Sequence, residues 1–121
     1  MPQLDVLQKM KTITKAAWDR VIHKACDVAN ASVMEDEPMC EVYSEQMLEI
    51  LDDLEEEFGV QSPILHTRAD YLDDPLERRR LYMKALELAR EEKDPDQVEV
   101  VLQSLRDLDE YIELDAARSK E

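Results

Sequence analysis

The chain has 121 residues, of which 30 are Asp or Glu and 15 are Lys or Arg, so its formal net charge at pH 7 is -15. That charge argues against nucleic acid and against an anionic membrane surface as partners, because both are bound by clusters of Lys and Arg. With 44% hydrophobic residues and one glycine, the sequence can build a core but has little material for hairpin turns or phosphate-binding loops. We therefore predict an all-α protein with a single all-helical domain over residues 1–121.

Apolar residues recur at steps of three and four through the first 30 residues, which predicts helical structure there. Those positions are Leu4, Leu7, Met10, Trp18, Val21, Ile22, Ala25, Val28 and Ala29. One long helix and two shorter ones both remain open, because Thr12, Ile13 and Thr14 are weak helix formers. The pattern breaks around residues 34–38, which we interpret as a connector.

A second helix is predicted from about Met39 to Phe58. Its apolar face consists of Cys40, Tyr43, Met47, Ile50, Leu51, Leu54 and Phe58. Gly59 follows directly and is well placed to end the helix as a left-handed C-cap.

Three dipeptides with proline in second place predict the remaining helix starts, since a polar N-cap followed by proline is a typical start signal. Ser62-Pro63 opens a short helix through Leu72, Asp74-Pro75 a helix to about Lys93, and Asp94-Pro95 the last helix. The inward positions are Leu81, Tyr82, Ala85, Leu86 and Ala89, then Val98, Val101, Leu102, Leu105, Leu108 and Ile112. Short connections favour antiparallel neighbours, so we expect about five to six antiparallel helices.

Residues 62–93 resemble a tetratricopeptide-type helical hairpin, with Leu81–Ala89 similar to the second helix of that family. The sequence departs from the family pattern at three places. His66 and Arg78 stand where small residues are usual, and Arg90 replaces the closing proline. No second copy follows at a 34-residue period. The resemblance implies a tetratricopeptide-like, solenoid-like helical stack rather than a true repeat array.

A second resemblance covers residues 48–94, above all Leu54–Gly59, Ile64–Tyr71 and Asp73–Tyr82. These segments resemble small helical immunity proteins, which are encoded beside bacterial polymorphic or contact-dependent toxins and neutralise them. The resemblance implies that the partner of this chain is a cognate toxin domain.

The negative charge is concentrated in one segment, since residues 35–57 hold eleven acids and no base. Glu41, Glu45, Glu49, Asp52 and Glu56 follow one another at steps of four, four, three and four, so they share one helix face. Like charges at this spacing oppose the helix by roughly 0.2–0.5 kcal/mol per pair. A solvated helix face is the simplest interpretation, but the complete absence of Lys favours a surface for a basic partner. The predicted partner-binding residues are Glu41, Glu45, Glu49, Asp52, Asp53 and Glu56, with Met34 and Met39 as hydrophobic anchors beside them.

No catalytic or metal-binding constellation emerges from the sequence. A zinc site would need four ligands, and His23, Cys26, Cys40 and His66 are not spaced as a known set. The two cysteines are expected to be reduced and mostly buried thiols, and Arg78–Arg80 to form surface salt bridges. We therefore predict no enzyme, no cofactor and no metal.

Two functions remain from these considerations. The first is a cytoplasmic immunity protein that binds and neutralises a basic toxin domain, such as a nuclease, through the acidic helix. The alternative is an acidic, tetratricopeptide-like secretion chaperone or adaptor that holds a client protein. The cytoplasmic location rests on the absence of a signal-like N-terminus and of any stretch of about 18 uncharged apolar residues.

Overall fold

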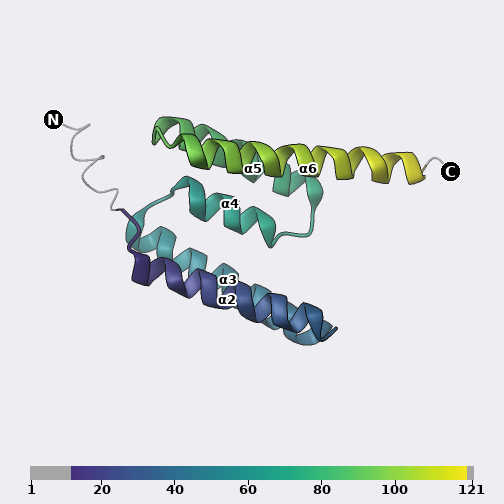
Figure 1. Ribbon diagram of the computed structural model, residues 1–121, viewed down its shortest axis with the longest axis horizontal. Helices are drawn as coiled ribbons and strands as arrows, with labels where there is room; N and C mark the ends of the chain where they lie inside the picture. Colours follow the sequence, from purple (N-terminus) through teal and green to yellow (C-terminus); the bar gives the residue numbers. More distant parts are fainter. Residues whose placement is uncertain (1–11, 120–121) are drawn as a thin grey trace. The chain divides into compact units, whose positions relative to one another are not determined.

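The computed structural model describes residues 12–119, which form five α-helices and contain no strand (Figure 1). The helices are α2 (Lys15–Val33), α3 (Glu37–Phe58), α4 (Ser62–Asp70), α5 (Pro75–Glu91) and α6 (Pro95–Ser119). Helix α2 packs with α3, and α5 packs with both α4 and α6. The all-α prediction is confirmed for the part of the chain that the structure describes.

The chain divides into two compact units at the Val60–Gln61 junction. The N-terminal unit contains α2 and α3, and the C-terminal unit contains α4, α5 and α6. The prediction of one domain over residues 1–121 stays a prediction.

Helix α2 begins at Lys15, so one continuous helix through the first 30 residues is excluded. Thr14 is extended and its hydroxyl accepts a hydrogen bond from the backbone N–H of Ala17 at 3.1 Å, so Thr14 caps a helix that begins at Lys15. The hydroxyl satisfies one of the N–H groups that the first helical turn leaves without a partner. Leu4, Leu7 and Met10 lie outside the described residues.

Helix α3 begins at Glu37, two residues before the predicted start, because Asp36 caps it. The Asp36 carboxylate accepts a hydrogen bond from the Met39 N–H at 3.2 Å, and Pro38 fits within the first turn. At the other end, Gly59 has φ 87° and ψ 172°, and its N–H donates to the Glu55 carbonyl at 2.9 Å. The positive φ is as predicted, but this ψ lies outside the left-handed helical region and is essentially restricted to glycine.

The start of α4 differs from the prediction, because Ser62 is not the N-cap. The N-cap position is held by Gln61, whose side chain makes no capping hydrogen bond. Ser62 is fully buried, and its hydroxyl donates to the Ala85 carbonyl of α5 at 2.7 Å. Its N–H donates to the Glu92 carboxylate at 3.1 Å. A residue just after α5 thus accepts a hydrogen bond from an N–H in the first turn of α4. Helix α4 ends at Asp70, before the predicted Leu72.

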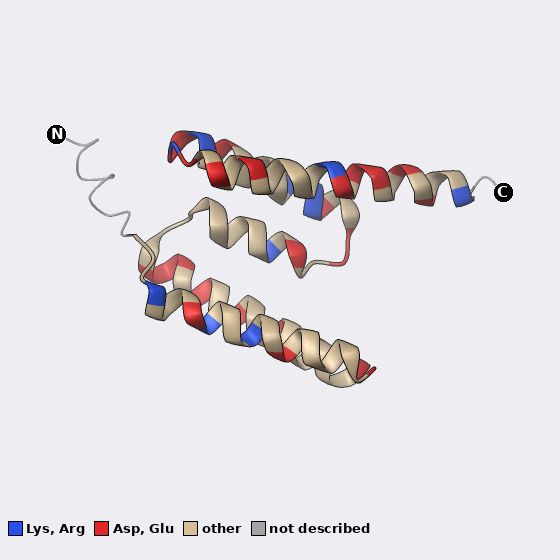
Figure 2. Cartoon of the chain, viewed as in Figure 1, with Lys and Arg blue, Asp and Glu red and all other residues tan. Residues whose placement is uncertain are grey.

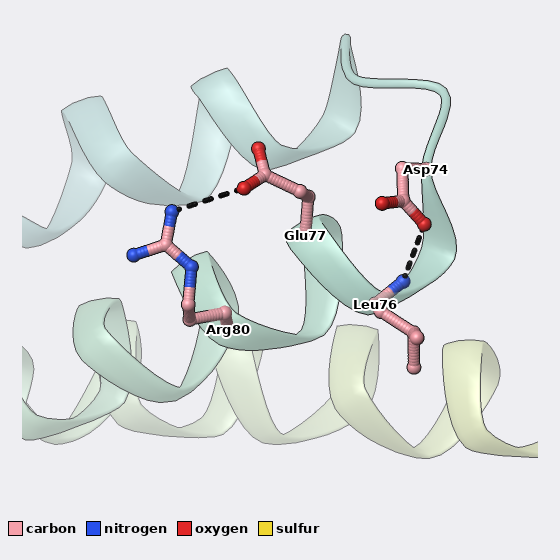
Figure 3. A network of polar contacts seen from close by, with 4 residues as sticks. All are labelled: Asp74, Leu76, Glu77 and Arg80. Carbon is pink, nitrogen blue, oxygen red and sulfur yellow. Dashed lines mark hydrogen bonds and ion pairs between the residues drawn. The ribbon is translucent and has the colours of Figure 1, made fainter.

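The two Asp-Pro start signals are confirmed. The Asp74 carboxylate accepts from the Leu76 N–H at 3.1 Å, and one turn into α5 Glu77 pairs with Arg80 at 3.2 Å (Figure 3). At the start of α6, the Asp94 carboxylate accepts from the Gln97 N–H at 3.1 Å. In both cases a carboxylate satisfies a backbone N–H of the first turn.

The N-terminal unit is an antiparallel pair of helices. Early α2 meets late α3 through Arg20 and Asp53, and late α2 meets early α3 where the Cys40 thiol approaches the Val28 carbonyl at 3.8 Å. The buried residues of this unit are Val21, Ala31, Met47, Leu51, Leu54 and Phe58, and Trp18 is half-buried on α2. All of these except Ala31 belong to the apolar stripes predicted from the sequence, whereas Ile22 and Ala29 of the predicted α2 stripe are exposed.

The C-terminal unit has a core to which all three of its helices contribute. The core consists of Leu65 and Ala69 from α4, Tyr82, Ala85 and Leu86 from α5, and Val101, Leu105 and Leu108 from α6. The inward face predicted for α5 is largely confirmed, and on α6 Val98, Leu102 and Ile112 are partly buried against the core.

The turn between α2 and α3 has the same backbone hydrogen bonds as the turn between α5 and α6. The Asp36 N–H donates to the Ala31 carbonyl at 2.9 Å, and the Asp94 N–H donates to the Ala89 carbonyl at 3.1 Å. These bonds close the end of each preceding helix as in a Schellman motif.

The backbone conformation of the two turns also matches. Each turn contains a residue at positive φ, Glu35 at 55° and Lys93 at 57°. Residues 31–40 of the first turn therefore correspond, one by one, to residues 89–98 of the second. The pair provides an internal comparison, because one backbone geometry carries two different sequences.

Candidate functional site

The acidic residues predicted to bind a partner lie on one side of α3. We call Glu41, Glu45, Glu49, Asp52 and Glu56 the acidic face, and all five are exposed. The helix turns its apolar residues inward instead, so that Met47, Leu51 and Leu54 are buried. Between its ends the acidic face covers about 22 Å at about 1.5 Å per residue. Because residues 35–57 contain no Lys or Arg, no base of α3 itself interrupts this face (Figure 2).

Asp53 is a member of the predicted set that is paired within the chain. Its carboxylate lies 3.3 Å from the guanidinium of Arg20 on α2. Both side chains are largely exposed, so the pair contributes little to stability, but it compensates part of the charge at this position. Sequence reasoning could not find the pair because 33 residues separate the two partners.

The two methionines predicted as anchors line the same hollow. Met34, in the turn after α2, is 78% exposed, and Met39 is half-buried in the first turn of α3. The hollow has a volume of about 290 Å³. We call it the turn hollow, and its lining consists of Asp27, Asn30, Ala31, Met34, Asp36, Met39 and Tyr43.

One cation from α2 already lies beside this region. The Lys24 ammonium donates to the Gln46 side-chain carbonyl at 2.7 Å and pairs with Asp27 at 3.2 Å. It also lies 5.0 Å from the centre of the Tyr43 ring. The position of Lys24 indicates that the carboxylate and aromatic groups here can accommodate a positive charge.

A polar cluster in the C-terminal unit was not foreseen from the sequence. The Tyr82 hydroxyl donates to the Asp70 carboxylate and accepts a hydrogen bond from Arg78 at 3.3 Å, while a second Arg78 nitrogen donates to the Ala69 carbonyl at 3.1 Å. Burial of the phenol, together with its bond to Asp70, raises the pKa of Tyr82. Arg78 therefore links α5 to the end of α4 and is not a free surface ion.

The other two arginines of the run behave as predicted. Arg79 pairs with Asp109 at 3.0 Å and Arg80 pairs with Glu77 at 3.2 Å, and all four side chains are exposed. The surface salt-bridge prediction is therefore confirmed for two arginines and wrong for Arg78.

A second polar contact joins α4 to α6. The Nε2 atom of His66 lies 2.8 Å from the Ser104 hydroxyl, and the His66 ring lies 5.5 Å from that of Tyr82. Burial lowers the pKa of His66, while the charge of Asp70 acts in the opposite direction. A serine hydrogen-bonded to histidine can be a nucleophile and base, but Ser104 lies inside α6, where backbone N–H groups are used by the helix and offer no oxyanion site. We interpret the pair as a contact between helices.

The cysteines differ in environment. Cys40 is half-buried, but Cys26 is exposed, so the prediction that both thiols are mostly buried is wrong for Cys26. Helix α2 has a wide solvent face, and Cys26 lies on it. Within residues 12–119, no group of three or more His, Cys, Asp or Glu side chains is placed to hold a metal ion. None of the helices described in that range is long and apolar enough to cross a membrane.

No family model, no curated protein and no solved structure matches the chain.

Proposed function

We propose that the chain acts by binding a basic partner protein through the acidic face of α3, and that this partner is a cognate toxin domain which the chain neutralises. One observation carries the proposal. Five carboxylates lie together on the exposed side of a helix whose own sequence provides no base to offset them.

Electrostatics explains how such a face would work. A concentrated negative field accelerates encounter with a positively charged surface, and the gain falls steeply as salt is added. A nuclease binds phosphate through Lys and Arg, so carboxylates presented at similar positions compete for the same cationic groups. A toxin held in this way cannot bind its own substrate.

A second candidate, a chaperone or adaptor for a secreted client, is favoured by a different observation. Val33 and Met34 are 81% and 78% exposed, and apolar side chains of this kind suit a protein that holds unfolded or partly folded segments. The tetratricopeptide-like stack expected for residues 62–93 belongs to this alternative. The two functions differ in their effect on the partner, since an inhibitor abolishes its activity at one-to-one stoichiometry, whereas a chaperone keeps it soluble.

The test is co-purification of the tagged chain with the product of the neighbouring gene, at about 50 mM and about 500 mM salt. In the variant Glu45→Lys/Glu49→Lys/Glu56→Lys, we expect affinity for the partner to fall at least about tenfold. The matched control is Glu99→Lys/Glu110→Lys/Glu113→Lys, which reverses three exposed acids of α6 and changes the net charge equally. Equal affinity of the two variants would contradict the acidic face as the binding surface. A bound partner that keeps its full activity would support the chaperone.

A further inference from the structure

The turn hollow lies where the end of α2 meets the start of α3, and it has a mixed chemical character. Its walls are apolar, formed by Ala31, Met34, Met39 and the ring of Tyr43. Two carboxylates, Asp27 and Asp36, and the amide of Asn30 complete the lining. Met39 and Tyr43 each stand two residues from Glu41, so the hollow and the acidic face lie on different sides of the same first turns of α3.

The matching turn between α5 and α6 shows that the backbone does not require apolar residues here. Residues 33, 34 and 39 correspond to Glu91, Glu92 and Gln97, all polar, in a turn with the same hydrogen bonds and the same positive φ. Val33 and Met34 are nevertheless 81% and 78% exposed. The apolar character of the first turn is thus not a condition for forming it, and it adds exposed apolar area beside the most acidic segment of the chain.

The lining of the hollow suits a side chain with an aliphatic stem and a cationic head. A long aliphatic stem suits the methionines, which adapt to irregular partners, and a cationic head suits the carboxylates. An aromatic ring favours a guanidinium, which is planar, weakly hydrated and stacks on ring faces. Both carboxylates can still attract a cation. Asp36 is bonded to a neutral N–H, and the Lys24 ammonium that pairs with Asp27 is also bonded to Gln46.

We propose that the turn hollow receives an arginine side chain of the basic partner, and that this arginine anchors the complex while the acidic face supplies long-range attraction. The inference rests on the proposed function, since it names the group of the same basic partner that the hollow recognises. It adds Asp27, Asn30, Ala31, Asp36 and Tyr43 to the binding surface. The arginine stem packs between Met34 and Met39 and its guanidinium lies against Asp36, beside the Tyr43 ring that Lys24 also contacts.

The first experiment uses the full chain with ¹³C-labelled methionine methyl groups and ¹⁵N-labelled amides, titrated with hexa-arginine peptide. Hexa-citrulline, which has the same shape without the charge, is the control. We expect hexa-arginine to shift the methyl signals of Met34 and Met39 together with the amides of the acidic face, and hexa-citrulline to shift neither.

A pair of variants separates the hollow from general attraction. Met34→Ser/Met39→Ser removes the apolar walls, and Leu76→Ser/Met83→Ser removes exposed apolar side chains from α5 as the matched control. The first variant is expected to bind hexa-arginine at least about fivefold more weakly than the wild type, since truncation of a contributing interface side chain costs at least that much, and the second to bind it unchanged. Unchanged thermal melting shows that each variant is folded, and the methyl shifts of the wild type provide a readout that needs no variant.

The outcomes distinguish the inference from the proposed function. Shifts in the acidic-face amides without shifts in the Met34 and Met39 methyls overturn the arginine anchor and leave the acidic face standing. No shift at either place overturns both. Methyl signals that depend on protein concentration would assign the hollow to a second copy of the chain, and methyl signals that move when residues 1–11 are deleted would assign it to that segment. Either result overturns the arginine anchor.

Discussion

At the scale of single residues, His66 makes stability depend on pH. Burial lowers its pKa below the ordinary value of 6.5, so the unfolded chain takes up a proton before the folded chain does. The free energy of unfolding is therefore fully retained above that value and falls as the pH drops through it. The groups that face the ring are Asp70, Tyr82 and Ser104, and the charge of Asp70 favours the protonated form. We expect urea unfolding to give a smaller free energy at about pH 5.5 than at about pH 7.5.

The control for this prediction is His66→Gln, which keeps a polar group near Ser104 but does not titrate. The decrease between the two pH values should be smaller in the variant, because the remaining decrease comes from other groups. If wild type and variant lose the same free energy of unfolding, the prediction is wrong.

The hydrogen-bond and ion-pair partners of single residues are the features that the sequence predicts least well. From their neighbours in the sequence, Ser62, Arg78 and Asp53 are predicted to be a cap, a surface ion and a partner-binding acid. Each instead bonds to a group that packing brings near from another helix, respectively the Ala85 carbonyl, the Ala69 carbonyl and the Arg20 guanidinium. No local pattern encodes such partners, because their approach depends on how the helices pack.

At the scale of helices and turns, local chemistry is sufficient for many predictions. The start signals at Asp74 and Asp94 were predicted correctly because capping involves only residues within one turn. The apolar stripe of α3 was predicted for the same reason, since its period is a property of the helix alone. The equivalence of the α2–α3 and α5–α6 turns was not visible, because the two share few residue types.

The turns lead to a prediction about stability. Lys93 is exposed and has φ 57°, where the side chain of any residue except glycine is crowded against the backbone. Lys93→Gly should therefore raise the free energy of unfolding, by up to about 1 kcal/mol after the greater freedom of glycine in the unfolded chain is subtracted. Urea unfolding measures the change.

Lys93→Ala serves as the control, since it removes the lysine side chain but keeps the crowding. The glycine variant should be more stable than the alanine variant. A glycine variant no more stable than the alanine variant would show that the positive φ carries no strain.

At the scale of the whole molecule, the charge of -15 acts against the folded state. Four successive like-charged steps along α3 oppose it by about 1–2 kcal/mol in total at low salt, at about 0.2–0.5 kcal/mol each. Added salt screens this repulsion, so the free energy of unfolding should be larger at about 500 mM than at about 20 mM NaCl. The variant Glu45→Gln/Glu49→Gln should show a weaker salt dependence, and an equally strong one would place the repulsion elsewhere.

The single tryptophan allows the N-terminal unit to be followed by fluorescence separately from the rest of the molecule. Trp18 is half-buried on α2, in the unit that also holds the acidic face and the turn hollow, and the C-terminal unit contains no indole. Selectively excited indole fluorescence therefore observes the α2–α3 pair alone, whereas helical circular dichroism observes every helix at once. Recording both signals in one titration tells whether a partner, an acid or a denaturant acts first on the helices that carry the proposed binding surface.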